Sequence, residues 1–453
     1  MDSVPIDLAP WRTRLKEARL FMLTGRVTRV IGLTVEVQGI NARIGEVCEI
    51  AAPGEPEPVR AEVVGFRDGS TLLMPLGELR GIYQGCHVTP SGKSLNVKAG
   101  EQLLGRVLNG LGEPIDGLGA LSGVFAGYPV DNRPPNPLQR RRVTEVLSTG
   151  VRVVDALLTC GRGQRIGIFS GSGVGKSTLL GMISRYSSAD VNVIALIGER
   201  GREVLDFIET DLGQEGLARS VVIVATSEQP ALVRLKGAYV SCAIAEYFRD
   251  QGKDVMFMMD SVTRFAMAQR EVGLAIGEPP ATKGYTPSVF AQLPKLLERP
   301  GMSQTGSITA FFTVLVDGDD LNEPIADAVR GILDGHIILS RSLAASNHYP
   351  AVDVLNSVSR LMSDITPEEH RKLAGQFRDL LAAYRQAEDL INIGAYVAGS
   401  NPRIDEAISS YRNMVDFLRQ DLNDVSDYEG SLELLKAIIH KGVIGHQQVP
   451  FSS

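Results

Sequence analysis

The stretch Arg165-Ile-Gly-Ile-Phe-Ser-Gly-Ser-Gly-Val-Gly-Lys-Ser-Thr178 joins an apolar strand to a glycine-rich turn and the start of a helix. Glycines at 171, 173 and 175 let successive backbone N–H groups point inward at an anion, and the helix N-terminus adds partial positive charge. Lys176 can then reach the outer phosphates of a nucleotide, and the Ser177 hydroxyl can bind a magnesium ion that bridges them. The stretch therefore predicts a phosphate-binding loop.

The whole loop is assigned to nucleotide binding, and its members are Ser170, Gly171, Ser172, Gly173, Val174, Gly175, Lys176, Ser177 and Thr178. One position departs from the usual pattern, because Ser170 stands five residues before Gly175, where that pattern has glycine. We treat this small side chain as tolerated variation.

Composition limits the class of protein. A chain of 453 residues with 44% hydrophobic residues predicts two or three domains, and a net charge of −7 argues against coating nucleic acid by bulk electrostatics. Four widely spaced cysteines lack the spacing of zinc sites and are predicted to be buried free thiols. The N-terminus has no signal-peptide pattern and no apolar run is long enough to span a bilayer, so we expect a cytoplasmic protein.

The first 95 residues show two patterns. Residues 9 to 22 read as an amphipathic helix with Trp11 on its apolar stripe, which either packs on its own domain or docks a partner. Short alternating segments separated by Gly, Asp and Pro turns follow over 23–95 and predict a small β-barrel. Only Phe66 and Tyr83 are aromatic there, too few to stack successive bases, so a structural or ring-forming barrel is favoured.

The rest of the chain divides into a mixed part and a helical part. Near-continuous apolar strands at 191–197, 220–225, 254–259 and 307–315 alternate with helical stretches, which predicts a parallel sheet covered on both faces. The pattern becomes helical after about 365. The predicted domains are an N-terminal helix over 1–22, a barrel over 23–95, a nucleotide-binding domain over 96–365 and a helical domain over 366–453.

Two carboxylates follow strands of the predicted sheet. Asp260 ends the strand at 255–259, where it can hold magnesium, with a helix-capping role as the alternative. Glu199 closes the strand at 193–197, where it can polarise an attacking water; alternatively it is a surface residue paired with Arg200 or Arg202. Spacing alone leaves both roles of Glu199 open.

Five ordered motifs bear on this choice: the loop itself, Gly198-Glu-Arg-Gly-Arg-Glu203, Met258-Met-Asp-Ser-Val-Thr-Arg-Phe-Ala266, Pro279-Pro-Ala-Thr-Lys-Gly-Tyr-Thr-Pro287 and Tyr349-Pro-Ala-Val-Asp-Val-Leu-Asn-Ser-Val-Ser-Arg360. Together they resemble the catalytic subunits of rotary ATP synthases and their type III secretion relatives, most of all the flagellum-specific ATPases. The resemblance implies an α/β core of the P-loop NTPase type with a RecA-like parallel sheet, an N-terminal β-barrel and a C-terminal α-helical domain.

The resemblance also implies the site and its partners. Lys176, Glu199, Arg200, Asp260 and Arg360 are the implied catalytic residues, with Arg360 acting as an arginine finger on a neighbouring subunit. Tyr349 is the implied adenine-stacking ring, although a core aromatic is its alternative, and Ser177 and Asp260 would bind Mg²⁺, the latter through water.

The implied activity is magnesium-dependent ATP hydrolysis by a homohexamer that energises flagellar protein export at the cytoplasmic face of the export gate. Implied partners are a regulator on the N-terminal helix, a coiled-coil stalk in the pore and export chaperone–substrate complexes, with no nucleic acid. The alternatives are an ATPase of a virulence secretion system, a non-catalytic nucleotide-binding ring subunit and an RNA-translocating hexamer.

Overall fold

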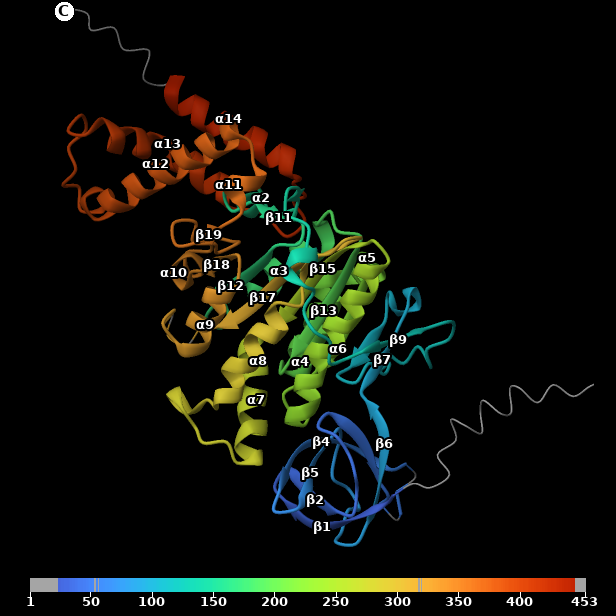
Figure 1. The fold of residues 1–453 in the computed structure, drawn as a ribbon. Coiled ribbons are helices and arrows are strands. Elements are labelled where there is room, and N and C mark those ends of the chain that lie inside the picture. The colour runs from blue at the N-terminus through green and yellow to red at the C-terminus, as the bar shows by residue number, and fades with distance from the viewer. Residues whose placement is uncertain (1–22, 53, 56, 317, 319, 445–453) are drawn as a thin grey trace, which may run out of the picture. The chain divides into compact units, whose positions relative to one another are not determined.

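The computed structural model describes residues 23–52, 54, 55, 57–316, 318 and 320–444. The chain divides into two compact units, one that ends at Leu95 and one that begins at Asn96. Figure 1 shows both units with their elements labelled. The predicted helix at 9–22 lies outside the described residues.

The first unit is a closed six-stranded barrel with the strand order β1-β2-β5-β4-β3-β6, all neighbours antiparallel. Alternate residues point inward, so Val35, Val37, Cys48, Val63 and Leu73 form its dry core. The barrel predicted from the turn spacing is confirmed. Its strands are β1 (Gly25–Ile31), β2 (Thr34–Gln38), β3 (Glu46–Ile50), β4 (Val59–Arg67), β5 (Ser70–Pro75) and β6 (His87–Ser94).

The second unit is built on a sheet whose path runs β19-β18-β12-β17-β15-β13-β14-β8. Its inner strands are parallel, and β13 and β14 are buried along their whole length, as their unbroken apolar sequences predict. The strands are β8 (Val107–Asn109), β12 (Arg165–Ser170), β13 (Val191–Ile197), β14 (Ser220–Ala225), β15 (Asp254–Asp260), β17 (Ser307–Leu315), β18 (Gly335–Leu339) and β19 (Val358–Ser359). The sequence did not indicate β8, nor the antiparallel pairing of β19 with β18 and of β16 (Gly301–Met302) with β17.

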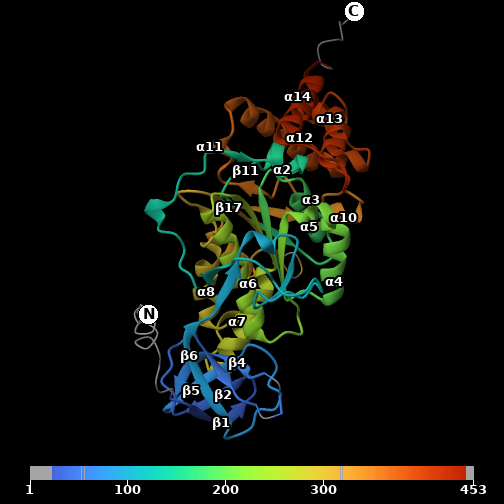
Figure 2. The same ribbon diagram turned by 90° about the vertical axis from the view of Figure 1, so that its right-hand side faces the viewer.

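Helices cover both faces of this sheet (Figures 1 and 2). The helix α6 (Ala231–Asp250) packs on β13, β14 and β15, and α7 (Val262–Ile276) packs beside it. On the other face, α3 (Lys176–Tyr186) joins Ile194, Leu196 and Met258 in one apolar cluster. The remaining helices near the sheet are α2 (Arg152–Leu157), α4 (Gly201–Asp206), the π-helical turn η3 (Phe207–Leu212), α5 (Gly213–Ala218), α8 (Pro287–Leu297), α9 (Pro324–Ile332), α10 (Arg341–Ala345) and α11 (Met362–Ile365).

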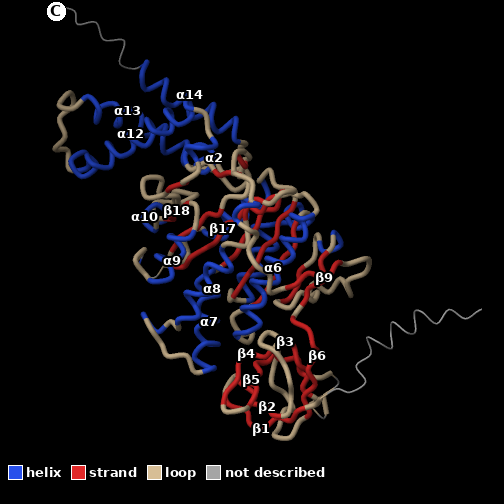
Figure 3. The backbone as a smooth tube through the Cα atoms, in the orientation of Figure 1, coloured by secondary structure: helices blue, strands red, loops and turns tan. Residues whose placement is uncertain are grey.

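The C-terminal part is helical throughout, which is plain in the blue tubes of Figure 3. It consists of α12 (Glu368–Asn392), α13 (Pro402–Leu418) and α14 (Tyr428–Ile444). Tyr384 of α12 stacks on Tyr411 of α13 with ring centroids 3.4 Å apart, and Phe377 contacts Phe417 below them. All three helices pack on α2, so this part shares its core with the sheet.

Minor elements complete the second unit. A ribbon of β7 (Asn96–Ala99) and β9 (Ala126–Pro129) precedes the short pair β10 (Val146–Leu147) and β11 (Cys160–Gly161), with 3-10 turns η1 (Glu101–Leu103), η2 (Pro137–Gln139) and η4 (Thr282–Gly284). The four cysteines Cys48, Cys86, Cys160 and Cys242 are buried free thiols, as predicted. In the described part of the chain, no helix is both long and apolar enough to cross a membrane.

Candidate nucleotide site

The glycine-rich loop leaves β12 at Ser170 and enters α3 at Lys176. Gly173 and Gly175 have φ values of +77° and +86°, a left-handed conformation that side chains disfavour. At Gly171 a Cβ atom would lie 2.5 Å from Nε of Arg341, so a larger residue there would displace that flexible side chain. Ser170 is the last strand residue and is buried, so the turn tolerates its small side chain.

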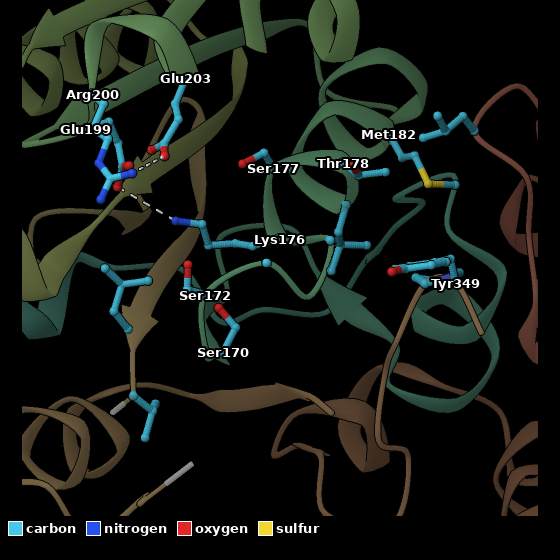
Figure 4. A pocket seen from close by; sticks show the side chains of 18 of the residues that line it. Ser170, Ser172, Lys176, Ser177, Thr178, Met182, Glu199, Arg200, Glu203 and Tyr349 are labelled. Atoms are coloured by element: carbon cyan, nitrogen blue, oxygen red, sulfur yellow. Dashed lines mark ion pairs between the residues drawn. The ribbon is translucent and has the colours of Figure 1, made fainter. Parts of the chain in front are cut away.

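Lys176 lies between two carboxylates at the carboxyl edge of the sheet. Its Nζ atom is 2.5 Å from Oδ1 of Asp260 and 3.7 Å from Oε1 of Glu199. The Thr313 hydroxyl also donates to Oδ1 of Asp260, at 2.7 Å. Figure 4 shows the lysine side chain extending from the loop toward Glu199. Glu199 and Asp260 are 61 positions apart in the sequence, and the parallel strands β13 and β15 place both beside the Lys176 ammonium group.

Burial and charge act in opposite directions on these groups. Burial disfavours the charged form of Lys176, but the attraction of Asp260 and Glu199 raises its pKa above the ordinary value. Burial, together with the negative charge of Asp260, raises the pKa of Glu199. Oε1 of Glu199 is buried without a hydrogen-bond partner in the described chain. The two carboxylates of the cluster therefore offer more acceptor atoms than one lysine satisfies.

A cavity of about 820 Å³ opens in front of the loop. Tyr349 lines it beside the loop, and its ring approaches Gly175 closely enough that a Cβ atom there would lie 3.2 Å away. Figure 4 shows Tyr349 and the Lys176 amine at opposite ends of the cavity. An aromatic ring at one end and a lysine at the other suit a ligand with a planar base and a charged tail.

The structure brings most of the predicted site residues together. The cavity is lined by Ser170, Gly171, Ser172, Gly173, Gly175, Lys176, Ser177, Thr178, Glu199, Arg200 and Tyr349. Val174 is buried, and Asp260 lies behind Lys176 rather than on the cavity wall. Arg360 is exposed and does not line this cavity; its Nη2 atom donates to the Arg330 carbonyl at 3.3 Å.

The surface ion pair considered for Glu199 is absent among the described residues. Arg200 pairs with Glu203, and Arg202 pairs with Asp206, both on exposed sides of α4. Glu199 itself is 9% exposed and faces Lys176. The alternative interpretation of Glu199 as a surface residue is therefore wrong.

Sequence reasoning missed part of the cavity wall. Arg264 on α7 lines it, and so do Gln420, Asp421 and Leu422 from the segment after α13. The backbone N–H of Gln420 donates to the Tyr349 carbonyl at 3.0 Å. Arg264 stands inside a quoted motif and could have been found there, whereas no local pattern marks residues 420–422.

The donor set fits a magnesium ion beside a phosphate. Mg²⁺ takes oxygen ligands, usually one or two carboxylate or hydroxyl groups together with phosphate oxygens and water. Ser177 supplies a hydroxyl on the cavity wall, Asp260 supplies a carboxylate, and the unpartnered Oε1 atom of Glu199 is close by. Ser177 and Asp260 are the residues that would hold the ion.

Comparison with known proteins agrees with this geometry. The ATP synthase alpha/beta family matches residues 150–359 with its nucleotide-binding domain and residues 27–92 with its beta-barrel domain. The T3SS EscN ATPase C-terminal domain matches residues 366–437. The Flagellum-specific ATP synthase of Bacillus subtilis is 57% identical over 415 residues, which cover 91% of this chain and 94% of the relative.

The chain belongs to the family of flagellar and type III secretion ATPases. The Type 3 secretion system ATPase of Xanthomonas euvesicatoria is 54% identical, with 91% of this chain and 93% of the relative covered. The assembled ATPase EscN of the enteropathogenic E. coli type III secretion system superposes with a TM-score of 0.87 at 45% identity, over 92% of this chain and all of that chain. The resemblance, the fold class and the ATPase class predicted from the sequence are confirmed.

Proposed function

We propose that this ATPase hydrolyses magnesium-bound ATP in a homohexameric ring and energises flagellar type III protein export. The observation that carries the proposal is the cluster of Lys176, Asp260 and Glu199 at the end of a cavity whose other end is Tyr349. Magnesium, when bound, would neutralise charge on the β- and γ-phosphates. Lys176 would leave Asp260 for those phosphates, and Tyr349 would hold the adenine ring.

Glu199 is the residue proposed to orient and polarise the attacking water. In its ionised form, the carboxylate can accept a hydrogen bond from a water in line with the γ-phosphate. Its Oε1 atom makes no hydrogen bond and faces Nζ of Lys176 at 3.7 Å, so it would become available to water when Lys176 moves to the phosphates. A non-catalytic ring subunit would bind nucleotide without needing this group. Replacing Glu199 therefore distinguishes a catalytic subunit from a non-catalytic one.

Glu199→Gln tests the assignment. Loss of a general base lowers kcat by about 10²- to 10⁴-fold, while ATP binding should remain within about threefold of the parent value. Glu209→Gln is the matched control, because Glu209 is an exposed glutamate of η3 that does not line the cavity. Equal turnover in Glu199→Gln and the parent would overturn the catalytic role and favour another base.

Arg360 supports a site that two subunits share. It is exposed and absent from the cavity wall of its own chain, so it cannot contact the γ-phosphate there. An arginine finger supplied by a neighbour is worth about 10³- to 10⁵-fold in kcat. We therefore expect Arg360→Ala to bind nucleotide and to lose hydrolysis.

Mixing two inactive variants tests the shared site. In an equal mixture of Arg360→Ala and Lys176→Ala, about a quarter of the interfaces in a closed ring would combine an intact loop with an intact Arg360. Activity should therefore return on mixing, whereas each variant mixed with itself stays inactive. Absence of recovery in mixtures shown to form mixed rings would mean that the finger lies elsewhere.

The proposed partners follow from relatives. A second solved EscN structure, with a TM-score of 0.85, is in complex with its central stalk EscO, so we propose a coiled-coil stalk for this ring as well. Release of substrates from export chaperones, delivery to the export gate and peripheral attachment at the cytoplasmic face of the membrane belong to the same proposal. The relatives include both flagellar and virulence ATPases, and a virulence secretion system is the second candidate. A deletion strain that loses flagellar filament secretion, and recovers it on complementation, would favour the flagellar role.

The N-terminal helix is the proposed docking site of a regulator. Deleting residues 1–22 should abolish capture of the regulator and leave basal hydrolysis unchanged; unchanged capture would refute the docking site. The RNA-translocating alternative predicts that single-stranded RNA raises ATP turnover. We expect no such stimulation.

A further inference from the structure

A second cavity, of about 720 Å³, lies behind the wall of the nucleotide site. It is enclosed by α10, the segment 348–356, α12 and the end of α13. Its lining includes the polar residues Ser340, His348, Asp353, Arg385, Glu388 and Arg419. None of these side chains belongs to the phosphate loop or to the carboxylate cluster.

The carboxylates of this cavity are already satisfied. Asp353 accepts the backbone N–H groups of Leu355 and Asn356, both at 3.2 Å, and the Asn356 side-chain amide at 2.8 Å. Glu388 accepts from Nη1 of Arg385 at 2.8 Å. Both carboxylates therefore already have hydrogen-bond donors from the protein, so neither indicates a cation site.

The donors of the cavity are in surplus. Arg419 and Arg385 are both exposed; the guanidinium of Arg419 makes no hydrogen bond or ion pair with any other described residue, and Arg385 uses one of its five donors on Glu388. His348 is 5% exposed, and its Nε2 atom has no partner within the described chain. A buried ring nitrogen without a partner costs free energy unless something binds to it.

Apolar side chains form the remaining walls. Leu343, Val354, Leu381 and Leu418 line the cavity beside the Tyr411 ring. A ligand that fills this space must combine acceptor atoms with an apolar body. A free phosphate would meet the arginines but leave the apolar walls in contact with water.

We propose that this cavity binds a small organic acid, with its carboxylate on Arg419 and Arg385 and its apolar body against Leu381 and Tyr411. The binding site stands independently of the proposed function. The coupling of this cavity to nucleotide binding rests on the proposed function.

The cavity shares a wall with the nucleotide site. His348 precedes Tyr349, and Arg419 precedes Gln420, whose N–H donates to the Tyr349 carbonyl at 3.0 Å. The Gln420 side chain also accepts from the Arg152 N–H at 2.7 Å and donates to the Gly150 carbonyl at 2.9 Å. A ligand that moves His348 or Arg419 therefore moves the proposed adenine platform, and the two ligands must change each other's affinity by one factor.

Benzoate is the probe, and neutral benzamide is its matched control. Titration of the full chain without nucleotide, followed by calorimetry and ligand-observed NMR, should show saturable benzoate binding with a Kd of about 0.1 to 1 mM. Arg419→Gln should weaken it by about tenfold or more, because a charge-assisted pair is lost. Arg412→Gln, an exposed arginine of α13 outside the cavity, should leave it unchanged.

Three results would overturn the site: no saturable benzoate binding, equal binding of benzamide, or equal binding by the Arg419→Gln and Arg412→Gln variants. Loss of benzoate binding in Lys176→Ala, but not in Arg419→Gln, would place the anion in the phosphate loop and also refute the site. If benzoate binds as expected and ADP binds with unchanged affinity, the coupling is refuted. If ADP does not bind at all, the proposed function fails while the cavity site stands.

Discussion

His348 makes the stability of the second unit depend on pH. Burial, reinforced by the charges of Arg419 and Arg385, lowers the pKa of its ring to about 4, against 6.5 ordinarily. Asp353 and Glu388 also line its cavity, but each is engaged by other donors. Below pH 6.5 the His348 imidazole is protonated in the unfolded chain but remains neutral in the folded chain. The contribution of His348 to the free energy of unfolding is therefore fully present above pH 6.5 and is lost as the pH falls toward 4.

The expected loss can be worked out from these values. Between pH 8 and pH 5, linkage with pKa values of 6.5 and about 4 gives a loss of about 2 kcal/mol from this one group. His348→Asn cannot titrate in this range. The free energy of unfolding of the parent should therefore fall about 2 kcal/mol more than that of the variant over the same interval.

Urea unfolding of both proteins at several pH values measures this difference. Far-UV circular dichroism is the suitable signal, because residues of the helices α12 and α13 line the cavity and their unfolding changes that signal. The transition of the unit that begins at Asn96 is the one to compare. Parallel pH dependences for parent and variant would refute the reasoning, whatever their absolute stabilities.

Three further outcomes are expected. Tyr349→Ala should raise the KM for ATP by about tenfold, since stacking on a base is worth roughly 1 to 3 kcal/mol, whereas Tyr349→Phe should not; steady-state kinetics decide. Arg299 and Glu246 are each 1% exposed and joined by bonds of 2.7 and 2.9 Å, so Arg299→Met should lower stability in urea by about 3 to 5 kcal/mol, and adding Glu246→Met should recover most of it. Gly181→Ala would bring a Cβ atom within 2.6 Å of the backbone of η3 and should cost about 1 to 3 kcal/mol, while Gly201→Ala, with open space around it, should change the urea midpoint little.

Local sequence was enough to predict the features that depend on local physics. Gly173 and Gly175 stand where the backbone turns left-handed, and the apolar runs at 191–197 and 254–259 became buried parallel strands. The position of Asp260 at the end of its strand then placed it at the edge of the sheet beside the loop. Each of these follows from backbone conformation or from the direction of a parallel strand.

The features that sequence did not reveal depend on distant contacts. Gln420 meets Tyr349 across 71 residues, and Arg341 lies against Gly171 from a distant part of the chain. The strand β8 is three residues long, too short for any periodicity to appear. Tertiary packing decides such contacts, so neither composition nor spacing announces them.

The bond between Lys176 and Asp260 affects which anions the phosphate loop can bind. A phosphate loop with an uncompensated lysine would collect any abundant cellular anion, and each would compete with the substrate. Here a carboxylate 2.5 Å away already holds the amine, so a simple anion must displace it and leave Asp260 without its cation. A triphosphate that arrives with its own divalent cation would supply a replacement charge for Asp260, so we expect the loop to prefer a metal-bound triphosphate to a free anion.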